Sequence, residues 1–394
     1  MICGFFKKVL LLIAVTISAV AAYADDAADS NKKSFIYNMD HSYGDSTTKG
    51  VYPNVSGTVL LEAKADRATS SKEGVKSFNS FANAEAKMAL NLNRNWSLRT
   101  KWRLNPILDR DTDYQEKTRY ILSNRKIHGG DNGLIVEELK LNFQNDDARF
   151  YAGKFNPIFG AMHRKAKRIG VFTTDFTRDY ELREKIGFGV DGLLENSEIS
   201  ASSFFADTTA LSNSAFTKRG SDNNNNGIAS NTKNLNSYTI AMEGSNPLDA
   251  DEKWHYNIGY RKLAVGGNNS NYADEHGYVF GSEYLYEVGE KSSLIPMVEI
   301  VKLKNFTGVR SRNATYITTA LMGVYSRWTA SAALIKRDIN NNLSLGKTHD
   351  KLLQYSVGYK FTDRFAVDVS RANVKESGVS APILGVMLSY LYQF

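Results

Sequence analysis

Cysteine and proline are scarce in this sequence. The single cysteine, Cys3, lies within the first 24 residues, so the remainder of the chain has no disulfide, thiolate nucleophile or cysteine-based metal site. Proline occurs only 6 times in 394 residues, whereas the chain has 29 Gly, 21 Tyr, 20 Phe and 4 Trp. Because aromatic residues favour strands and proline interrupts them, this composition favours a β-rich fold.

Long apolar runs are also missing. Beyond residue 24 there is no run of 18 apolar residues, which excludes a bundle of transmembrane helices. The mean hydropathy of -0.37 is that of a water-soluble chain. A transmembrane barrel has a similar average, because each strand alternates lipid-facing and water-facing residues. Composition alone therefore leaves a soluble β-protein and a membrane barrel open.

The charge balance and the histidines argue against several ligand classes. The net charge is +7 for the whole chain and +5 (7 minus 2) once Lys7 and Lys8 are removed, a surplus too small and dispersed to favour nucleic acid. The 6 histidines show no close spacing of the kind that metal ligands need. We therefore predict no nucleic-acid partner and no metal or other cofactor.

The first 24 residues have the three parts of an export signal. Lys7 and Lys8 form a positive start, residues 9–20 are apolar, and Ala22-Tyr23-Ala24 fits the A-x-A cleavage pattern. The alternative is a membrane-anchor helix, but the apolar stretch is too short for one. The sequence therefore predicts a signal peptide at 1–24, export, and a mature chain that begins at Asp25.

Alternating residues define the strands, and residues 96–104 show the pattern most clearly. Their even positions are Trp, Leu, Thr, Trp and Leu, whereas three odd positions are Arg99, Lys101 and Arg103. If these three cations faced lipid, each would cost about 2–4 kcal/mol near the bilayer midplane, so we expect them to face water. Residues 82–92 alternate in the same way, and residues 93–95 join the two segments as a hairpin.

The same pattern recurs along the chain and predicts about sixteen strands. They are 55–65, 82–92, 96–104, 134–144, 148–155, 186–194, 197–206, 235–245, 253–264, 277–288, 292–303, 314–325, 327–337, 351–361, 364–373 and 383–394. Links after even-numbered strands are short and links after odd-numbered strands are mostly long and polar. A soluble sandwich gives no such rule, whereas outer-membrane barrels have short periplasmic turns and long extracellular loops. We predict an all-β, closed antiparallel transmembrane barrel at 55–394, preceded by a polar segment at 25–54.

The last strand resembles the C-terminal strand of outer-membrane proteins. Tyr390, Tyr392 and Phe394 share one face of an alternating segment that ends in Phe. In that family the barrel-assembly machinery reads such a strand as an insertion signal. The resemblance implies that this machinery is a partner of the chain.

A second segment resembles the porins, especially the phosphate-selective porin group. It comprises residues 153–157 (Gly-Lys-Phe-Asn-Pro), Gly160, a long loop at 156–185, and residues 187–189 (Gly-Phe-Gly). In that family the third loop folds into the lumen and makes the constriction, and the resemblance implies the same for 156–185. Acidic residues dilute this loop, so phosphate specificity is not carried over.

The predicted pore-lining residues are charged. They are Arg99, Lys101, Arg103, Glu85, Lys87, Glu138, Lys140 and Lys154 on the strands, with His163, Arg164, Lys165, Lys167 and Arg168 in the loop. Rows of Arg and Lys favour anions, but screening over about 8 Å makes this a mild preference. For 163–168 the alternative is an exposed basic loop that meets lipopolysaccharide at the cell surface.

Three motif matches are weak. Residues 187–192 fit G-x-G-x-x-G but lie in a strand pattern, and residues 222–227 begin like a calcium loop whose twelfth position is Lys233 rather than Glu. For a hydrolytic site, the one arrangement with any merit is His255 beside Asn257. We therefore predict that the chain is not an enzyme.

These patterns predict a Gram-negative outer-membrane porin for passive diffusion of small hydrophilic solutes and ions. The alternatives are a substrate-specific channel for a chelate or oligosaccharide, and a plugged barrel acting as an adhesin or surface antigen. Expected partners are outer-membrane lipid, lipopolysaccharide and small hydrophilic solutes. Porins of this kind are commonly trimers, so a homotrimer is a further expectation.

Overall fold

Sixteen long strands form the wall of the structure, a computed structural model. It describes residues 51–70, 75–106, 132–165, 174–194, 196–217, 229, 231, 233–245, 254–266, 270–289, 291–341 and 346–394. These residues belong to one unit, Asp40–Phe394. The predicted signal peptide at 1–24 and residues 25–50 of the polar segment lie outside the described residues.

The wall strands follow one another in chain order. They are β1 (Asn54–Ser70), β2 (Val75–Asn91), β3 (Trp96–Pro106), β4 (Asn132–Gln144), β5 (Ala148–Phe155), β6 (Lys185–Leu194), β7 (Ser197–Ala206), β9 (Ser237–Ser245), β10 (Trp254–Leu263), β11 (Glu275–Tyr284) continued by β12 (Tyr286–Gly289), β13 (Ser292–Lys304), β14 (Arg312–Tyr325), β15 (Trp328–Asn341), β16 (Gly346–Lys360), β17 (Phe365–Glu376) and β18 (Val379–Gln393). The short β8 (Ala215–Phe216) is not one of the wall strands. It pairs with Gly133 and Leu134 at the N-terminal end of β4.

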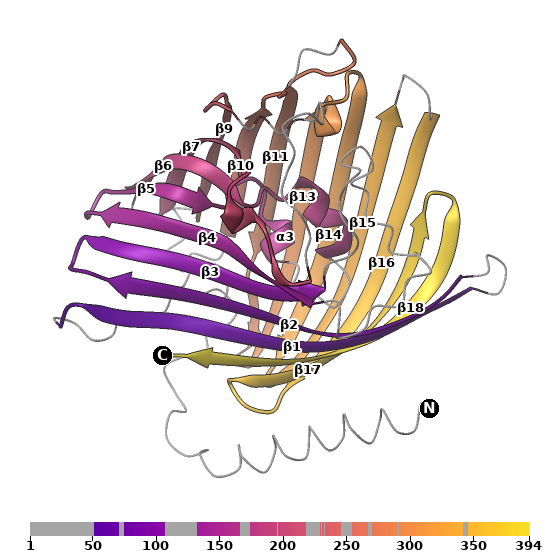
Figure 1. Cartoon of the computed structure of the whole chain (residues 1–394). Coiled ribbons are helices and arrows are strands. Elements are labelled where there is room, and N and C mark those ends of the chain that lie inside the picture. Colours follow the sequence, from indigo (N-terminus) through magenta and orange to yellow (C-terminus); the bar gives the residue numbers. More distant parts are fainter. Residues whose placement is uncertain are drawn as a thin grey trace. The chain divides into compact units, whose positions relative to one another are not determined.

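The sheet closes on itself. Each wall strand pairs antiparallel with its neighbours, and β1 pairs with β18 from Thr58↔Gln393 to Ala68↔Ile383. Figure 1 shows the strands following one another around the barrel in the order of the sequence. Each predicted strand overlaps one wall strand, and the predicted bounds of β5 and β7 match the observed ones. The prediction of a closed antiparallel barrel of about sixteen strands is confirmed.

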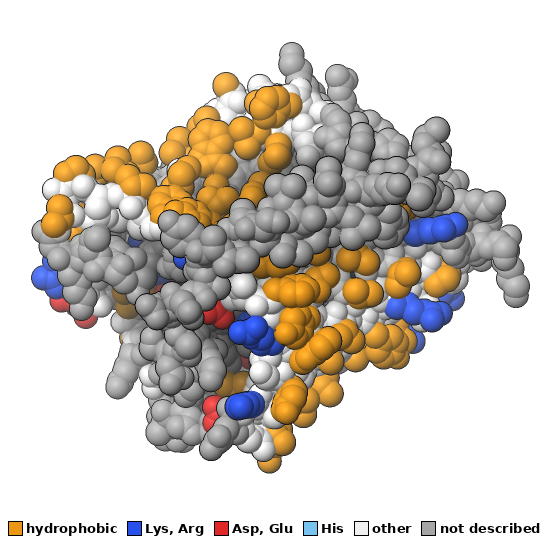
Figure 2. All heavy atoms as spheres, turned by 90° about the horizontal axis from the view of Figure 1, so that it is seen from below, with side chains coloured by type: hydrophobic (Ala, Val, Ile, Leu, Met, Phe, Trp, Pro, Cys, Tyr) orange, Lys and Arg blue, Asp and Glu red, His pale blue; other side chains and the backbone are white. Residues whose placement is uncertain are grey.

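The outer face of the barrel is apolar. Near the end where the links are short, which we call the short-link end, exposed aromatic side chains point outward; they include Trp96, Phe150, Trp254, Tyr284, Tyr325, Trp328, Phe361, Tyr392 and Phe394. Ile258, Phe280 and Val357 are exposed further along their strands. Figure 2 shows hydrophobic side chains spread over the visible outer surface. Such a surface, with an aromatic girdle at its rim, is typical of a barrel embedded in lipid.

The interior contains part of the chain between β5 and β6. The described part of this link has two short helices, α3 (Met162–Lys165) and α4 (Thr174–Thr177), and a 3-10 turn, η4 (Arg178–Tyr180). Two further 3-10 turns, η5 (Ala210–Ser212) and η6 (Phe306–Gly308), follow β7 and β13. Figure 1 shows α3 inside the ring of strands.

A hydrophobic core packs between this link and one side of the wall. From the link it takes Phe159, Tyr180 and Leu182, and from the strands it includes Val279, Val301 and Tyr316. Since the strand residues are buried and belong to the inward-facing set, the core lies inside the barrel. Within the described residues, no helix is long and apolar enough to cross a membrane.

Candidate functional site

Charged side chains cover the inner side of the wall at β2, β3 and β4. The register places Glu85 opposite Arg103 and Lys87 opposite Lys101, so these side chains share the inner face. The Lys101 ammonium lies 3.5 Å from Glu85 Oε2, and Lys87 lies 3.6 Å from Glu85 Oε1. The predicted basic row is therefore interleaved with acids.

Glu137 completes this charged cluster and is a residue that the sequence analysis missed. Arg103 Nη2 donates a hydrogen bond to Glu137 Oε1 (3.1 Å), and Arg103 Nε forms an ion pair with Oε2 at 2.9 Å. Lys101 lies 3.4 Å from Oε1. A bulge in the β3–β4 pairing, between Lys101 and Trp102, lets both Glu137 and Glu138 turn inward. The outward residues Leu134, Val136, Leu139 and Leu141 skip one position at this point, which is the sequence signal of the bulge.

The lower part of the same wall has two further cations. Lys140 lies 2.8 Å from Glu138 Oε2. With its amide oxygen turned toward Arg99, Asn142 accepts hydrogen bonds from Nε (3.1 Å) and Nη1 (3.2 Å). Glu85, Lys87, Arg99, Lys101, Arg103, Glu137, Glu138 and Lys140 are called the charged wall below.

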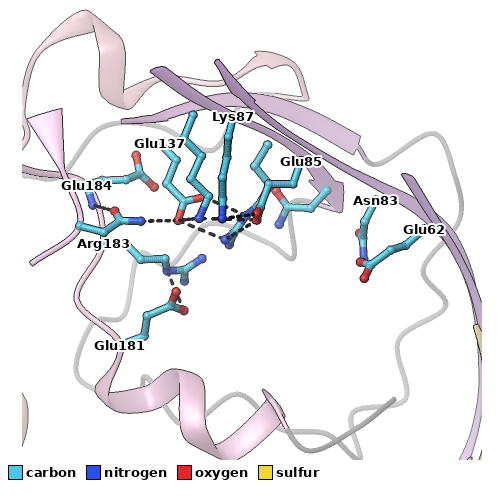
Figure 3. Close-up of polar contacts among 12 residues, drawn as sticks. Glu62, Asn83, Glu85, Lys87, Glu137, Glu181, Arg183 and Glu184 are labelled. Carbon is cyan, nitrogen blue, oxygen red and sulfur yellow. Dashed lines mark hydrogen bonds and ion pairs between the residues drawn. The ribbon is translucent and has the colours of Figure 1, made fainter. Parts of the chain in front are cut away.

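The link between β5 and β6 contacts the charged wall at its first residue. Asn156 Nδ2 donates to Glu137 Oε1 (2.8 Å), and Asn156 Oδ1 accepts from the backbone N–H of Glu184 (2.9 Å). Arg183 Nε lies 3.3 Å from Glu181 Oε2. Figure 3 shows Glu181, Arg183 and Glu184 on the link near Glu85 and Glu137 on the wall.

Glu181 keeps its negative charge in this setting. Burial raises its pKa, but the positive charges of Arg183, His163, Arg103 and Arg178 outweigh that effect and hold the pKa well below the usual range for a glutamate. The link therefore presents both signs of charge toward the wall.

On its other side the link is fixed to β13 by one buried carboxylate. Glu299 Oε2 accepts from the backbone N–H of Ala161 (2.6 Å), and Oε1 accepts from the Tyr180 hydroxyl (2.6 Å). Met162 N and Asn257 Nδ2 also donate to it, at 3.2 Å each. Because a hydrogen bond to a charged group contributes about 1.5–3 kcal/mol, Glu299 is a strong anchor for the link.

Two buried arginines add to this anchor. Arg337 on β15 lies 2.9 Å from Asp179, 2.7 Å from Asp350 and 2.8 Å from Glu376, and stacks on Phe176 at 4.2 Å. On β10, Arg261 Nη1 donates to the Tyr180 carbonyl (2.6 Å), and its Nε donates to Glu275 (2.9 Å). The link thus crosses from the charged wall to β10, β13 and β15.

The predicted residues of the loop have different positions. Lys165 forms a 2.6 Å ion pair with Glu283 on β11, and the His163 ring lies edge-on to Tyr180 with centroids 6.2 Å apart. For Arg164 only the backbone, within α3, is described, and Lys167 and Arg168 lie outside the described residues.

Lys154 lies on the opposite side of the wall from the lumen. The register pairs it with Leu139 and Ile186, which belong to the outward-facing set. It is nevertheless buried, because the chain after β7 covers it: its ammonium binds Glu184 (3.0 Å), Asp207 (2.8 Å) and the Leu211 carbonyl (2.8 Å). This position differs from the lumenal one that the sequence predicts.

The strands also carry the residues suggested for a hydrolytic site and for the assembly signal. In the part of the chain that the structure describes, no group of three or more His, Cys, Asp or Glu side chains is arranged to hold a metal ion. Asn257, the suggested partner of His255, is instead bonded to Glu299. Tyr390 and Tyr392 lie on the outward side of β18, where they pair with Leu61 and Val59.

Comparison with known proteins identifies the fold. No family model and no curated protein matches the sequence. Among solved structures, the outer-membrane channel DcaP of Acinetobacter baumannii has a TM-score of 0.53 at 12% identity, covering 86% of this chain and 96% of that chain. OccAB3 of the same organism has a TM-score of 0.50 at 7% identity, covering 86% and 100%.

The chain has the fold of a bacterial outer-membrane barrel. At these identities the likeness concerns the fold, and it agrees with the closed sheet and the apolar outer face described above. Together these observations indicate the outer membrane as the location of the barrel.

Proposed function

We propose that this chain is a porin, a water-filled channel for passive diffusion of small hydrophilic solutes and ions. The observation that carries the proposal is the charged wall, eight ionic side chains on the inner face of β2–β4, which the link between β5 and β6 contacts through Asn156 and Glu137. A polar, charged inner face behind an apolar outer face is typical of barrels with a water-filled interior.

A mild anion preference is part of the proposal. The charged wall has five basic residues and three acidic ones, a difference of +2. Arg and Lys at a constriction favour anions, and the paired acids keep the preference weak. The resemblance to the phosphate-selective group stays a prediction, and phosphate selectivity is not proposed.

The test is a reversal potential across a KCl gradient with the mature protein in a planar bilayer. Two variants remove one charge of opposite sign from the same network: Lys101→Gln and Glu85→Gln. We expect ohmic current steps from the unaltered chain, a shift toward cation selectivity for Lys101→Gln, and a shift toward anion selectivity for Glu85→Gln. A matched control, Lys304→Gln, removes a cation from the outer face of β13 and leaves the potential unchanged.

Two results would contradict parts of the proposal. If both lumenal variants conduct with an unchanged reversal potential, the chain is a channel but the charged wall does not set its selectivity. An absence of steps from protein whose β-sheet circular dichroism is intact would overturn the porin.

The second candidate is a plugged barrel that acts through its outer loops as an adhesin or surface antigen. The hydrophobic core inside the barrel, which includes Phe159, Tyr180 and Tyr316, favours it, because that core closes part of the cross-section. It predicts no conductance from folded protein. A substrate-specific channel would instead conduct and be blocked by one solute.

Partners beyond the lipid remain proposals. Tyr390, Tyr392 and Phe394 would serve as the signal for the barrel-assembly machinery, and deletion of Phe394 should lower the yield of membrane-inserted protein. A homotrimer is proposed from the resemblance to porins, and the mass of the detergent-solubilised protein tests it.

A further inference from the structure

Three lysines stand in a row on the outer face of the barrel. Lys336 on β15 lies directly opposite Lys351 on β16, which lies directly opposite Lys375 on β17. All three side chains are exposed and belong to the outward-facing set of their strands. We call them the lysine row.

The lysine row is unfavourable without a counter-ion. Neighbouring strands are about 4.8 Å apart, and like charges directly opposite one another destabilise a sheet. The nearest outward acid on these strands, Asp338, is already bound to His349 Nδ1 at 2.7 Å. Within the described residues no carboxylate forms an ion pair with the lysine row. The arrangement therefore calls for an anion from outside the chain.

The position of the lysine row indicates which anion can reach it. On β15, Trp328 of the aromatic girdle is 52% exposed and precedes Lys336 by eight positions. Eight residues span about 27 Å along a strand, or about 20 Å along the membrane normal at the usual tilt. The apolar band of such barrels is about 25 Å tall, so the row lies near its far rim, about 5 Å inside it, and the long lysine side chains reach the head groups from there.

This rim faces the leaflet on the side of the long loops. Because outer-membrane barrels have their long loops outside the cell, the lysine row meets the outer leaflet. A phosphodiester carries one negative charge, whereas a phosphomonoester carries about -1.5 to -2 at neutral pH, which matches three neighbouring ammonium groups better.

We propose that the lysine row is a binding site for a lipid of the outer leaflet whose head group carries a phosphomonoester. One phosphate lies over Lys351 and receives hydrogen bonds from the ammonium groups on either side, while the acyl chains follow the apolar surface below, at Leu334 and Leu353. The site is on the lipid-facing side of the wall, so it does not depend on whether the interior conducts.

The test is lipid binding to the full mature chain in zwitterionic detergent, read by native mass spectrometry. Phosphatidic acid serves as the phosphomonoester probe and phosphatidylglycerol as the phosphodiester probe. We expect phosphatidic acid to bind more tightly than phosphatidylglycerol. Changing all three residues of the lysine row to Ser should weaken phosphatidic acid binding about 100-fold, since each lysine near a lipid surface contributes about one kilocalorie per mole.

A matched control removes the same charge from the same rim. Lys302, Lys304 and Lys347 are outward and exposed but do not stand opposite one another, so their replacement by Ser should change binding by less than about threefold. Replacement of the lysine row by Arg keeps the charge and should keep binding, which separates a lost site from a misfolded barrel.

Three results would overturn the proposal. Equal losses in the two triple-Ser variants would mean that only the general charge of the rim matters. Equal binding of phosphatidic acid and phosphatidylglycerol would show that the site has no preference for a phosphomonoester. Displacement of phosphatidic acid by millimolar inorganic phosphate would identify a free-anion site instead of a lipid site.

Discussion

The backbones of Gly57 and Phe394 exchange two hydrogen bonds, with the N–H of each donating to the carbonyl of the other at 2.9 and 3.0 Å. This contact joins the last residue of the chain to the first strand of the barrel. It also brings the Phe394 ring against Gly57, since a Cβ atom at that position would lie 2.7 Å from Phe394 Cζ and 2.6 Å from the Lys87 carbonyl. Closure of the barrel at this seam depends on a residue without a side chain.

Gly57→Ala should therefore destabilise the barrel. Overpacking of this kind costs about 1–3 kcal/mol, because the ring or the neighbouring strand must move. The measurement is the free energy of unfolding in detergent, followed by circular dichroism in urea. Gly323→Ala is the control, since its nearest neighbour is 3.9 Å away. Equal stabilities of the two variants would show that the Phe394 ring moves aside freely.

Tyr180→Phe should loosen the link between β5 and β6. The variant removes one donor from the buried carboxylate of Glu299 and leaves the ring in place, which should cost about 1.5–3 kcal/mol of unfolding free energy. In a planar bilayer the open channel should also become noisier, because the link has lost an anchor. Tyr355→Phe, on the exposed outer face, serves as the control. A Tyr180→Phe channel with unchanged noise and unchanged stability would show that the Tyr180 hydroxyl is not needed to anchor the link.

Replacement of Arg337 is expected to lower the free energy of unfolding by more than replacement of Tyr180. Arg337→Met leaves Asp179, Asp350 and Glu376 buried together without their shared cation, and breaking a buried pair in this way costs about 3–5 kcal/mol. Adding Asp179→Asn should recover part of the loss, because it removes one of the stranded charges. Urea unfolding of the single and double variants measures this coupling, and identical stabilities would exclude it.

The wall of the barrel could be predicted because a charged side chain on the lipid-facing side of a strand is energetically costly. Arg99, Lys101 and Arg103 must avoid hydrocarbon, and that requirement fixes which face of β3 is inside and which residues of β2 join it. Short links then locate the strand ends. These are local signals, each contained within about twenty residues, so they can be read from one sequence.

The contacts of the interior could not be predicted in the same way. Glu299 meets Tyr180 from 119 positions away, and Arg337 meets Asp179 from 158 positions away, with no pattern in the sequence that pairs them. Glu137 was missed because strict alternation does not allow for a bulge. Lys154 was predicted to line the lumen because a charged side chain is expected to meet water. Its charge is instead balanced by Glu184 and Asp207, where the chain after β7 covers it.

Glu181 gives a prediction about pH whose sign follows from its neighbours. Burial raises the pKa of this carboxyl group, but the positive charges of Arg183, His163, Arg103 and Arg178 lower it by more. The pKa in the folded protein therefore lies below the ordinary value of 4.5. The stabilising contribution of the carboxylate is then fully present above pH 4.5 and is lost only as the pH falls through the lower, folded value.

The difference in reversal potential between the unaltered channel and Glu181→Gln should consequently be the same at pH 7 as at pH 4, with the variant more anion-selective at both. With an ordinary pKa, only about a quarter of the carboxylates would be ionised at pH 4 and the difference would shrink accordingly. A difference that falls in this way would mean that water reaches Glu181 and screens it from the cations around it. A constant difference would mean that the link holds a fixed negative charge beside the charged wall, which limits how anion-selective the channel becomes in acid.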